Sequence, residues 1–427
     1  MSHPLTASLD GALEEIAQAY ASVPFFRKLM DDAGLHPRDI HTASDVRRIP
    51  STSKADYRRN FPAGVLMAGT TLNDPFAYRS RSSGTTGERL LTIVHSYALA
   101  ERMTVTSAAN PRLSAVFAAA KQQRICRYAA PNCSDVECAT PATTPESRTL
   151  PDGTRVLPVA HDLLATPSAM IDQAVSEIAG YQPHWLYTDP MHLAFLAGNL
   201  LARGITPPPA GGIVLTYNVV TQSARRQVTD VFGAGAVIVE VVSMSELGWM
   251  GMECPQGHVH MNTECFYLEL LADGRPAEPG QLAELYVTSI GDQMSPHLRY
   301  RTGDLYTLTD GTCPCGHPSP RLEFHGRLSH VVTRDGRPVL TPRQLDRLVG
   351  PAPWLTFYKL RQLDEHRAVF RYIPADGQAD HASYAASLAR HLQPVLGEDM
   401  KITVEAVGYI ECERSGKFLP CVSEVPR

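Results

Sequence analysis

The sequence lacks long apolar runs, an excess of basic residues and a large number of cysteines. No apolar run approaches the length that crosses a bilayer, and the acidic N-terminal stretch MSHPLTASLDGALEEIAQAY is unlike a secretory signal peptide. The net charge of −5 argues against a nucleic-acid-binding protein, because neutralising phosphates requires a basic surface. Nine cysteines, an odd number in so long a chain, indicate a reducing compartment rather than a disulfide scaffold. We therefore expect a cytoplasmic protein with no membrane or nucleic-acid partner.

The composition is that of an ordinary globular protein with more than one core. Hydrophobic residues make up 44% and charged residues 19%, which is typical of soluble domains. A chain of 427 residues exceeds what one hydrophobic core normally serves, so we expect at least two domains.

Helix-like and strand-like segments alternate through the middle of the chain. Apolar spacing predicts helices over 171–178, 193–201 and 221–232, and strands in HWLYT, GGIVLTY and AVIVEVV. This alternation favours a mainly parallel α/β sheet. Between Glu264 and Leu308 the pattern becomes strand, turn, strand, which predicts an antiparallel or barrel-like part. Near the N-terminus, Asp10 is the expected N-cap of a helix that continues to Tyr20.

The last hundred residues read as a small α+β domain. Thr341 and Pro342 predict the start of the helix PRQLDRLV, because they suit the N-cap and first helical positions. AVFRYI and KITVEAV read as strands and SYAASLARHLQPVL as a helix. We place the boundary near Gly326, which gives domains of residues 1–326 and 327–427. The second domain is too short for independent catalysis but suits a mobile lid.

The strongest local motif is SSGTTGER. Small hydroxylated residues around glycines let backbone N–H groups and hydroxyls converge on anionic oxygens. The Lys-Ser/Thr ending of a P-loop is missing, so this is a different phosphate-binding loop. The predicted phosphate-binding residues are Ser82, Ser83, Gly84, Thr85, Thr86 and Gly87.

Further motifs follow in a fixed order, and together they resemble those of one family. They are VPFFRKLMDDAGLHPRDIHTASDVRRIPSTSKADYRRNFP, SSGTTG, PHWLYTDPMHLAFLA, SMSELG, RYRTGD, HGRL and ERSGKFLP. In content and order they resemble the adenylate-forming superfamily, and most closely its phenylacetate–coenzyme A ligase branch. The resemblance covers nearly the whole chain. It implies a large N-terminal domain of mixed, largely parallel sheets with helices and a small barrel-like part, carrying a mobile α+β C-terminal lid.

The resemblance also implies site residues and cofactors. Lys417 would bridge the α-phosphate of ATP and the substrate carboxylate, and Arg327 would pair with ribose or phosphate. Glu246 would hold Mg²⁺, since hard cations prefer carboxylate oxygen. Ser245 and Asp304 would bind the nucleotide, with the Asp304 carboxylate accepting hydrogen bonds from the ribose hydroxyls.

Several positions depart from the pattern of the family. Val242 replaces the tyrosine that stacks on adenine, and Ser243 replaces the glycine after it. Glu88 and Arg89 replace the lysine and proline that follow the phosphate loop in the family, which places a carboxylate near the phosphates. Leu328, Ser329 and His330 stand where the family has the two aspartates of the hinge. The hairpin TRDGRP replaces the turn that contacts the coenzyme A arm. These changes bear mainly on the transfer of the acyl group to its acceptor, which follows the reaction with ATP.

A second constellation predicts a structural zinc ion. The knuckle CPCG brings two sulfurs close together, and a Cys/His pair upstream could complete a tetrahedron. The predicted ligands are Cys254, His260, Cys313 and Cys315, with His258 as the alternative to His260.

The acyl pocket is predicted by analogy with the family. Its expected lining comes from residues 128–132, 187–192, 217–220 and 245–249. The residues singled out are Tyr128, Tyr187, His192, Asn218, Met244 and Trp249. These residues suit a flat aromatic acid, with Asn218 or His192 reading a polar substituent.

The sequence therefore predicts an ATP-dependent acid–thiol ligase, a monomer or homodimer, that forms acyl-AMP and pyrophosphate. Coenzyme A is the expected acceptor. A carrier-protein thiol or an amine, as in natural-product biosynthesis, is the alternative. A rival of another class is a catalytically silent nucleotide-binding scaffold.

Overall fold

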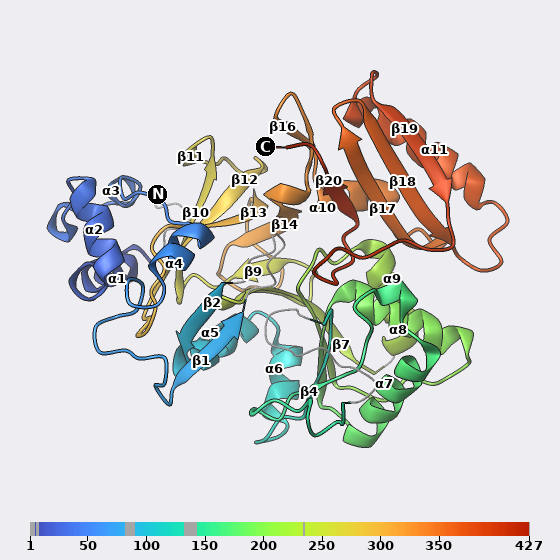
Figure 1. The fold of residues 1–427 in the computed structure, drawn as a ribbon, viewed down its shortest axis with the longest axis horizontal. Coiled ribbons are helices and arrows are strands. Elements are labelled where there is room, and N and C mark those ends of the chain that lie inside the picture. The colour runs from blue at the N-terminus through green and yellow to red at the C-terminus, as the bar shows by residue number, and fades with distance from the viewer. Residues whose placement is uncertain (1–4, 6–7, 82–89, 132–142, 234, 427) are drawn as a thin grey trace. The chain divides into compact units, whose positions relative to one another are not determined.

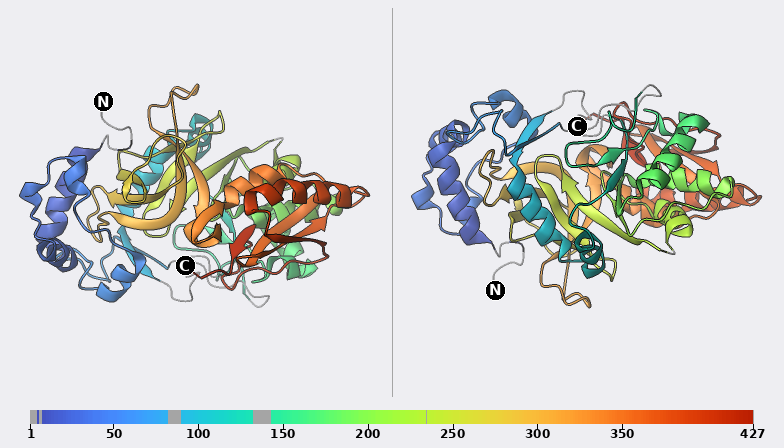
Figure 2. Two further views of the ribbon diagram at one scale, coloured as in Figure 1. Left: turned by 90° about the horizontal axis from the view of Figure 1, so that it is seen from above. Right: turned by 90° about the horizontal axis from the view of Figure 1, so that it is seen from below.

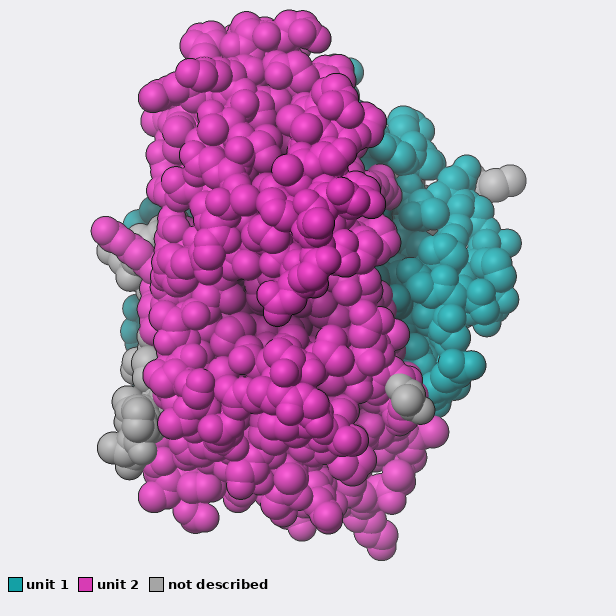
Figure 3. All heavy atoms as spheres, turned by 90° about the vertical axis from the view of Figure 1, so that its right-hand side faces the viewer, with its two compact units in different colours: residues 1–114, 241–324 teal, residues 115–240, 325–427 magenta. Residues whose placement is uncertain are grey.

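The computed structural model describes residues 5, 8–81, 90–131, 143–233 and 235–426. By their contacts these form two compact units, each made of two stretches of chain (Figure 3). Unit 1 comprises residues 1–114 and 241–324, and unit 2 comprises residues 115–240 and 325–427. Within the described part of the chain, every helix is too short or too polar to span a membrane.

Unit 2 contains the parallel sheet that the alternating pattern predicts. Its strands lie in the order β4 (Arg155–Val156), β3 (Ile125–Tyr128), β5 (Trp185–Thr188), β6 (Gly212–Leu215) and β7 (Val237–Met244), all parallel. Helices α7 (Ser168–Tyr181), α8 (Pro190–Ala202) and α9 (Gln222–Phe232) pack on one face of these strands (Figures 1 and 2). That face presents every second strand residue, including Tyr128, Leu186 and Leu215.

The C-terminal part of unit 2 has the predicted α+β elements. They are β15 (Val332–Arg334), β16 (Arg337–Leu340), α10 (Pro342–Val349), β17 (Leu355–Asp364), β18 (Arg367–Pro374), α11 (His381–Leu396), β19 (Lys401–Ala406) and β20 (Cys421–Ser423). The longer strands pair in the order β19-β18-β17-β20. Thr341 forms a capping box with Gln344, as the sequence predicts. Phe357, Ile410 and Phe418 share one apolar core with the helices that cover the parallel sheet.

Unit 1 combines N-terminal helices with antiparallel strands. The helices are α1 (Leu9–Ser22), α2 (Pro24–Asp32), α3 (Ala43–Val46), α4 (Lys54–Asn60), α5 (Ser96–Ser107) and the start of α6 (Pro111–Ala118). The strands are the pair β1 (Ala77–Arg81) and β2 (Leu91–His95), then β8 (Gly248–Glu253), β9 (Val259–Met261), β10 (Phe266–Ala272), β11 (Arg275–Pro276), β12 (Ala283–Ser289), β13 (Tyr300–Thr309) and β14 (Arg321–Arg327).

One expectation is corrected in unit 1, and one open alternative is decided. Asp10 is not the N-cap: α1 begins at Leu9 with Ser8 in the N-cap position, so Asp10 lies in the first turn, where the helix dipole favours a carboxylate. Of the two alternatives for Glu264–Leu308, the antiparallel one is observed. Strands β10, β12 and β13 pair antiparallel in a linear order that continues to β14, β9 and β8.

Candidate functional site

Lys417 lies on a tight loop between β19 and β20. The Glu413 N–H donates to the Lys417 carbonyl at 2.9 Å, and the Gly416 N–H donates to the Glu413 carbonyl at 2.7 Å. Gly416 has a φ of +77°, and a Cβ there would lie only 3.1 Å from the His161 carbonyl oxygen. The turn therefore requires glycine both for its backbone conformation and for its close approach to the parallel part of unit 2.

The lysine reaches the carboxyl edge of the parallel strands. Its Nζ donates to the carbonyl oxygen of Tyr217, just after β6, at 3.0 Å and lies 5.9 Å from the centre of the Tyr217 ring. Next to it, the Asn218 Nδ2 donates to the Phe418 carbonyl at 2.7 Å. Tyr217 has a φ of 74°, a strained value for an aromatic residue and one that recurs at functional sites. Ligands of parallel α/β sheets bind at this edge.

A group of buried polar side chains lies at the ends of β3 and β5. Tyr128, Thr188, Asp189 and His192 are each at most 1% exposed. The Tyr128 hydroxyl, the Thr188 hydroxyl, one Asp189 oxygen and both His192 ring nitrogens have no hydrogen-bond partner in the described structure. The His192 Nδ1 is 3.2 Å from the Asp189 Oδ1, and the Tyr128 and His192 ring centres are 6.3 Å apart. Such unsatisfied groups indicate a place that a ligand or water completes.

The other predicted pocket residues of unit 2 are placed differently. Tyr187 precedes Thr188, the register partner of Tyr128, so Tyr187 projects from the opposite face of the strands. Its ring packs edge-on against Tyr217 at 5.3 Å. The Asn218 amide is already bonded to the Phe418 carbonyl and to the Val219 N–H, whereas neither ring nitrogen of His192 has a hydrogen-bond partner. Thr188 and Asp189 lie in the predicted lining segment 187–192, but only the fold shows that polar atoms of both are buried without hydrogen-bond partners.

Unit 1 holds the predicted magnesium ligand. The Glu246 side chain is 5% exposed, accepts a hydrogen bond from the Tyr300 hydroxyl at 3.3 Å and lies 3.5 Å from the Lys54 Nζ. The preceding Ser245 carbonyl accepts a hydrogen bond from the Ser80 hydroxyl at 3.1 Å, which ties this turn to β1. A carboxylate in this setting fits a hard cation.

The remaining predicted residues are divided between the units. Met244 and Trp249 flank Glu246 in unit 1 on β7 and β8, and Asp304 is buried in β13 with its N–H bonded to the Thr302 hydroxyl at 3.0 Å. Arg327 ends β14 and is half-buried in unit 2. The predicted phosphate-binding residues Ser82–Gly87, with Glu88 and Arg89, lie outside the described residues.

The four predicted metal ligands come together in unit 1. The ligand atoms of Cys254, His260, Cys313 and Cys315 all lie within 4.8 Å of one another. The Cys315 Sγ is 3.3 Å from the His260 Nε2, while the His260 Nδ1 bonds the Ser319 carbonyl at 2.8 Å. That second bond fixes the ring and leaves the Nε2 for a metal.

The pKa values of two thiols in the cluster shift in opposite directions. Burial raises the pKa of the Cys313 thiol, but hydrogen bonds from Cys315, His260 and His258 outweigh burial and lower the pKa to about 6. Burial and the neighbouring sulfurs of Cys313 and Cys254 raise the pKa of the Cys315 thiol to about 11. Metals bind the thiolate form of cysteine. His258, the alternative ligand, has its Nδ1 3.3 Å from the Cys313 Sγ but is not one of the four mutually close groups.

Comparison with known proteins agrees with these features. No model of a known protein family matches the chain. The phenylacetate-coenzyme A ligase of Thermus thermophilus is 26% identical over 436 residues, covering 94% of this chain and 92% of that protein. That of Pseudomonas putida is 25% identical over 84% of this chain and 76% of its own length. Among solved structures, 2-hydroxyisobutyryl-CoA ligase in complex with R3-HIB-AMP superposes with a TM-score of 0.73 at 18% identity, covering 98% of this chain and 89% of that one. The resemblance predicted from the motifs, to the phenylacetate–coenzyme A ligase branch of the adenylate-forming superfamily, is therefore confirmed.

Proposed function

We propose that this protein activates a small carboxylic acid with ATP and passes the acyl group to coenzyme A. In the first step a carboxylate oxygen attacks the α-phosphorus of ATP, the bond to the β-phosphate oxygen breaks, and acyl-AMP and pyrophosphate form. In the second step the thiol sulfur attacks the acyl carbon, the bond to AMP breaks, and the thiol proton is released. The similarity to phenylacetate-coenzyme A ligases along nearly the whole chain supports both steps.

The position of Lys417 is the observation that carries this proposal. The first step brings two anions together, so it needs a cation at the reacting oxygens. The Lys417 ammonium is 3.0 Å from the Tyr217 carbonyl at the carboxyl edge of the sheet, and an ammonium is a compact charge with rotatable donors. In the reaction it would exchange the carbonyl for the oxygens of the α-phosphate and the carboxylate.

Further roles are proposed for four residues that the family motifs mark. Glu246 would hold Mg²⁺, which would offset the charge of the phosphates. Asp304 would accept hydrogen bonds from the ribose hydroxyls, Arg327 would pair with ribose or phosphate, and Ser245 would line the nucleotide site. The loop Ser82–Gly87 would donate to the β- and γ-phosphates.

For the acid, we propose a compact, flat molecule that carries a hydrogen-bonding group. Aromatic side chains make up much of the predicted lining, which suits an aryl acid. The unpartnered polar atoms of Tyr128, Asp189 and His192 offer both donors and acceptors to a substituent. A site built to bond a polar group discriminates strongly against analogues that lack it.

The metal cluster of unit 1 is proposed to hold zinc in a structural role. Two sulfurs on a tetrahedral zinc ion lie about 3.8 Å apart, given Zn–S bonds of about 2.3 Å. The Cys254 and Cys313 sulfurs are 3.8 Å apart. Three thiolates and one imidazole would leave no open position for a substrate, so the ion would fix the loops of β8, β9 and β14.

We also propose that residues 327–427 move as a lid between the two steps. The lysine loop would serve adenylation and then withdraw. A carrier-protein thiol or an amine is the alternative acceptor, because the hairpin TRDGRP stands where members of the family contact the coenzyme A arm.

The test is acid-dependent exchange of labelled pyrophosphate into ATP across a panel of aromatic, hydroxylated and aliphatic acids. We expect exchange with polar-substituted aryl acids above that with aliphatic ones. If ATP binds but no acid of a broad panel supports exchange, the protein is a silent nucleotide-binding scaffold.

A further inference from the structure

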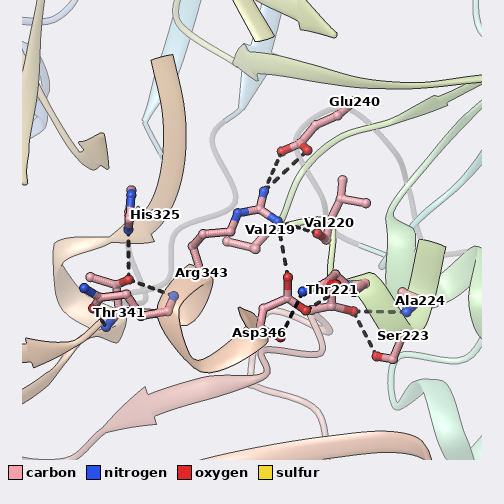
Figure 4. A network of polar contacts seen from close by, with 12 residues as sticks. Val219, Val220, Thr221, Ser223, Ala224, Glu240, His325, Thr341, Arg343 and Asp346 are labelled. Atoms are coloured by element: carbon pink, nitrogen blue, oxygen red, sulfur yellow. Dashed lines mark hydrogen bonds and ion pairs between the residues drawn. The ribbon is translucent and has the colours of Figure 1, made fainter. Parts of the chain in front are cut away.

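A cluster of largely buried charges joins α10 to the parallel part of unit 2 (Figure 4). Arg343, on the first turn of α10, donates from Nη1 to the Val220 carbonyl at 2.8 Å. Its Nη2 is 3.2 Å from a Glu240 oxygen at the end of the parallel segment of β7. Its Nη1 is also 3.4 Å from the Asp346 Oδ2, one turn further along α10.

Asp346 completes the cluster by capping another helix. Its carboxylate, 1% exposed, accepts a hydrogen bond at 2.7 Å from the backbone N–H of Gln222, the first residue of α9. That N–H has no partner within its own helix, and the helix N-terminus carries partial positive charge. Two carboxylates therefore face one guanidinium and one helix N-terminus, which carries only about half a positive charge.

Arg343 of this cluster and Lys417 both bond the segment that connects β6 to α9. The segment between β6 and α9 runs from Thr216 to Thr221. Lys417 bonds its first part through the Tyr217 carbonyl, and Arg343 bonds its last part through the Val220 carbonyl. Both side chains come from the segment after residue 325, so this segment contacts the connection at two points.

We propose that Arg343, with Glu240 and Asp346, is a positioning residue that holds Lys417 at the carboxyl edge of the sheet during adenylation. The inference rests on the proposed function. A charged contact suits this task better than an apolar one for two reasons. Separating the two partners so that both are hydrated costs little net stability, and the contact forms only in one geometry. It can therefore be made for one half-reaction and broken for the other.

The test separates the two half-reactions in Arg343→Met and Glu240→Gln. Both should slow pyrophosphate exchange by about tenfold or more, since small misplacement of a catalytic group is costly. Transfer from supplied acyl-adenylate to coenzyme A should stay at the wild-type rate or rise. The matched control is Arg371→Gln, which breaks a half-exposed ion pair with Glu405 in the same segment and should change neither rate. Equal losses in both half-reactions, or no loss in exchange, would overturn the proposal.

A second comparison asks whether the cluster acts through the lysine. In a Lys417→Ala background, adding Arg343→Met should slow exchange no further, because no ammonium remains to be positioned. A further tenfold loss in the double variant would show a separate, merely structural role.

The failure of the proposed function can be told apart from the failure of this inference. Amide hydrogen exchange of the first turn of α9 and of residues 413–418 should rise together in Arg343→Met and not in Arg371→Gln. If no acid supports exchange by the wild type, this coupled loosening still upholds the positioning contact. Unchanged protection of residues 413–418 in Arg343→Met rejects it.

Discussion

Glu15 is a buried carboxyl group whose protonation should govern stability at neutral pH. Burial, and then the charge of Asp292, raise its pKa from 4.5 to about 8, although its carboxylate accepts a hydrogen bond from the Gly291 N–H at 2.8 Å. Between these two values the folded chain keeps a proton that the unfolded chain has lost. The free energy of unfolding should therefore fall as pH rises through this interval.

Glu15→Gln should remove that decline, since an amide of the same shape does not titrate. Denaturant unfolding should show the variant more stable than the wild type at about pH 8.5 and close to it at about pH 4. Glu14→Gln, an exposed neighbour on α1, is the control and should leave the profile unchanged. A wild-type stability that does not fall through this interval would contradict the raised pKa.

A substitution of His192 tests whether the buried polar groups at the ends of β3 and β5 bind the substrate acid. His192→Phe keeps an aromatic ring but removes two nitrogens that have no hydrogen-bond partner, one of them 3.2 Å from the Asp189 carboxylate. The KM for a polar-substituted acid should rise by about tenfold, the value of one net hydrogen bond, while that for an unsubstituted analogue should hardly change. Tyr128→Phe, which removes one oxygen, should act in the same direction. Equal effects on both acids would show that these residues only pack the core.

Single residues also mark the limit of sequence-based reasoning. Lys417, Glu246 and Asp304 could be proposed because they lie in dense motifs. Tyr217 was proposed only as part of the pocket lining: its strained backbone has no sequence signature, and Asn218, beside it, tolerates positive φ better. Arg343 and Glu240 meet from positions about a hundred residues apart, and nothing in the sequence joins them.

At the scale of elements, sequence motifs predicted those helices and strands whose formation depends on neighbouring residues in the chain. The helix α10 has the predicted bounds because Thr341 and Pro342 define its start through their own side chains. The parallel strands were predicted because strands buried on both faces are continuously apolar. The choice between an antiparallel and a barrel-like part was open, because pairing between distant strands decides it.

Substitutions in the Cys/His cluster should change both the zinc content and the melting temperature of the protein. Purified protein should hold about one zinc ion per chain, as structural tetrahedral sites do. Cys313→Ser should lose the metal and melt several degrees lower, because the loops around it lose their shared anchor. His260→Gln should also lose zinc and His258→Gln should keep it, which separates the two candidate ligands by metal analysis. A metal-free wild type of unchanged stability would refute the site.

The hairpin formed by β15 and β16 carries the prediction about the acceptor. Asp335 and Gly336 form its turn, both with positive φ, as a tight Asp-Gly turn requires. Since this turn replaces the one that meets coenzyme A in the family, free coenzyme A should be accepted with a high KM. Transfer to a phosphopantetheinylated carrier protein should be compared under the same conditions. Saturation at low coenzyme A, with no carrier activity, would show that the replacement has no effect.

At the scale of the whole molecule, the proposed function requires a lysine on the C-terminal segment to act at the carboxyl edge of the parallel sheet. The motifs predicted the fold across nearly the full chain, because each was a short, dense set of residues whose order is itself informative. The predicted lid motion follows from the resemblance and needs the two half-reactions to be measured separately.

The most direct measurement is Lys417→Ala in the two half-reactions with the acid that the panel identifies. Pyrophosphate exchange should fall by roughly a hundredfold or more, the scale of losing one preorganised charge at the transition state. Transfer from chemically supplied acyl-adenylate to the thiol should survive nearly intact. If exchange continued at the wild-type rate in a folded Lys417→Ala protein, Lys417 would not be the adenylation cation and the central claim would be wrong.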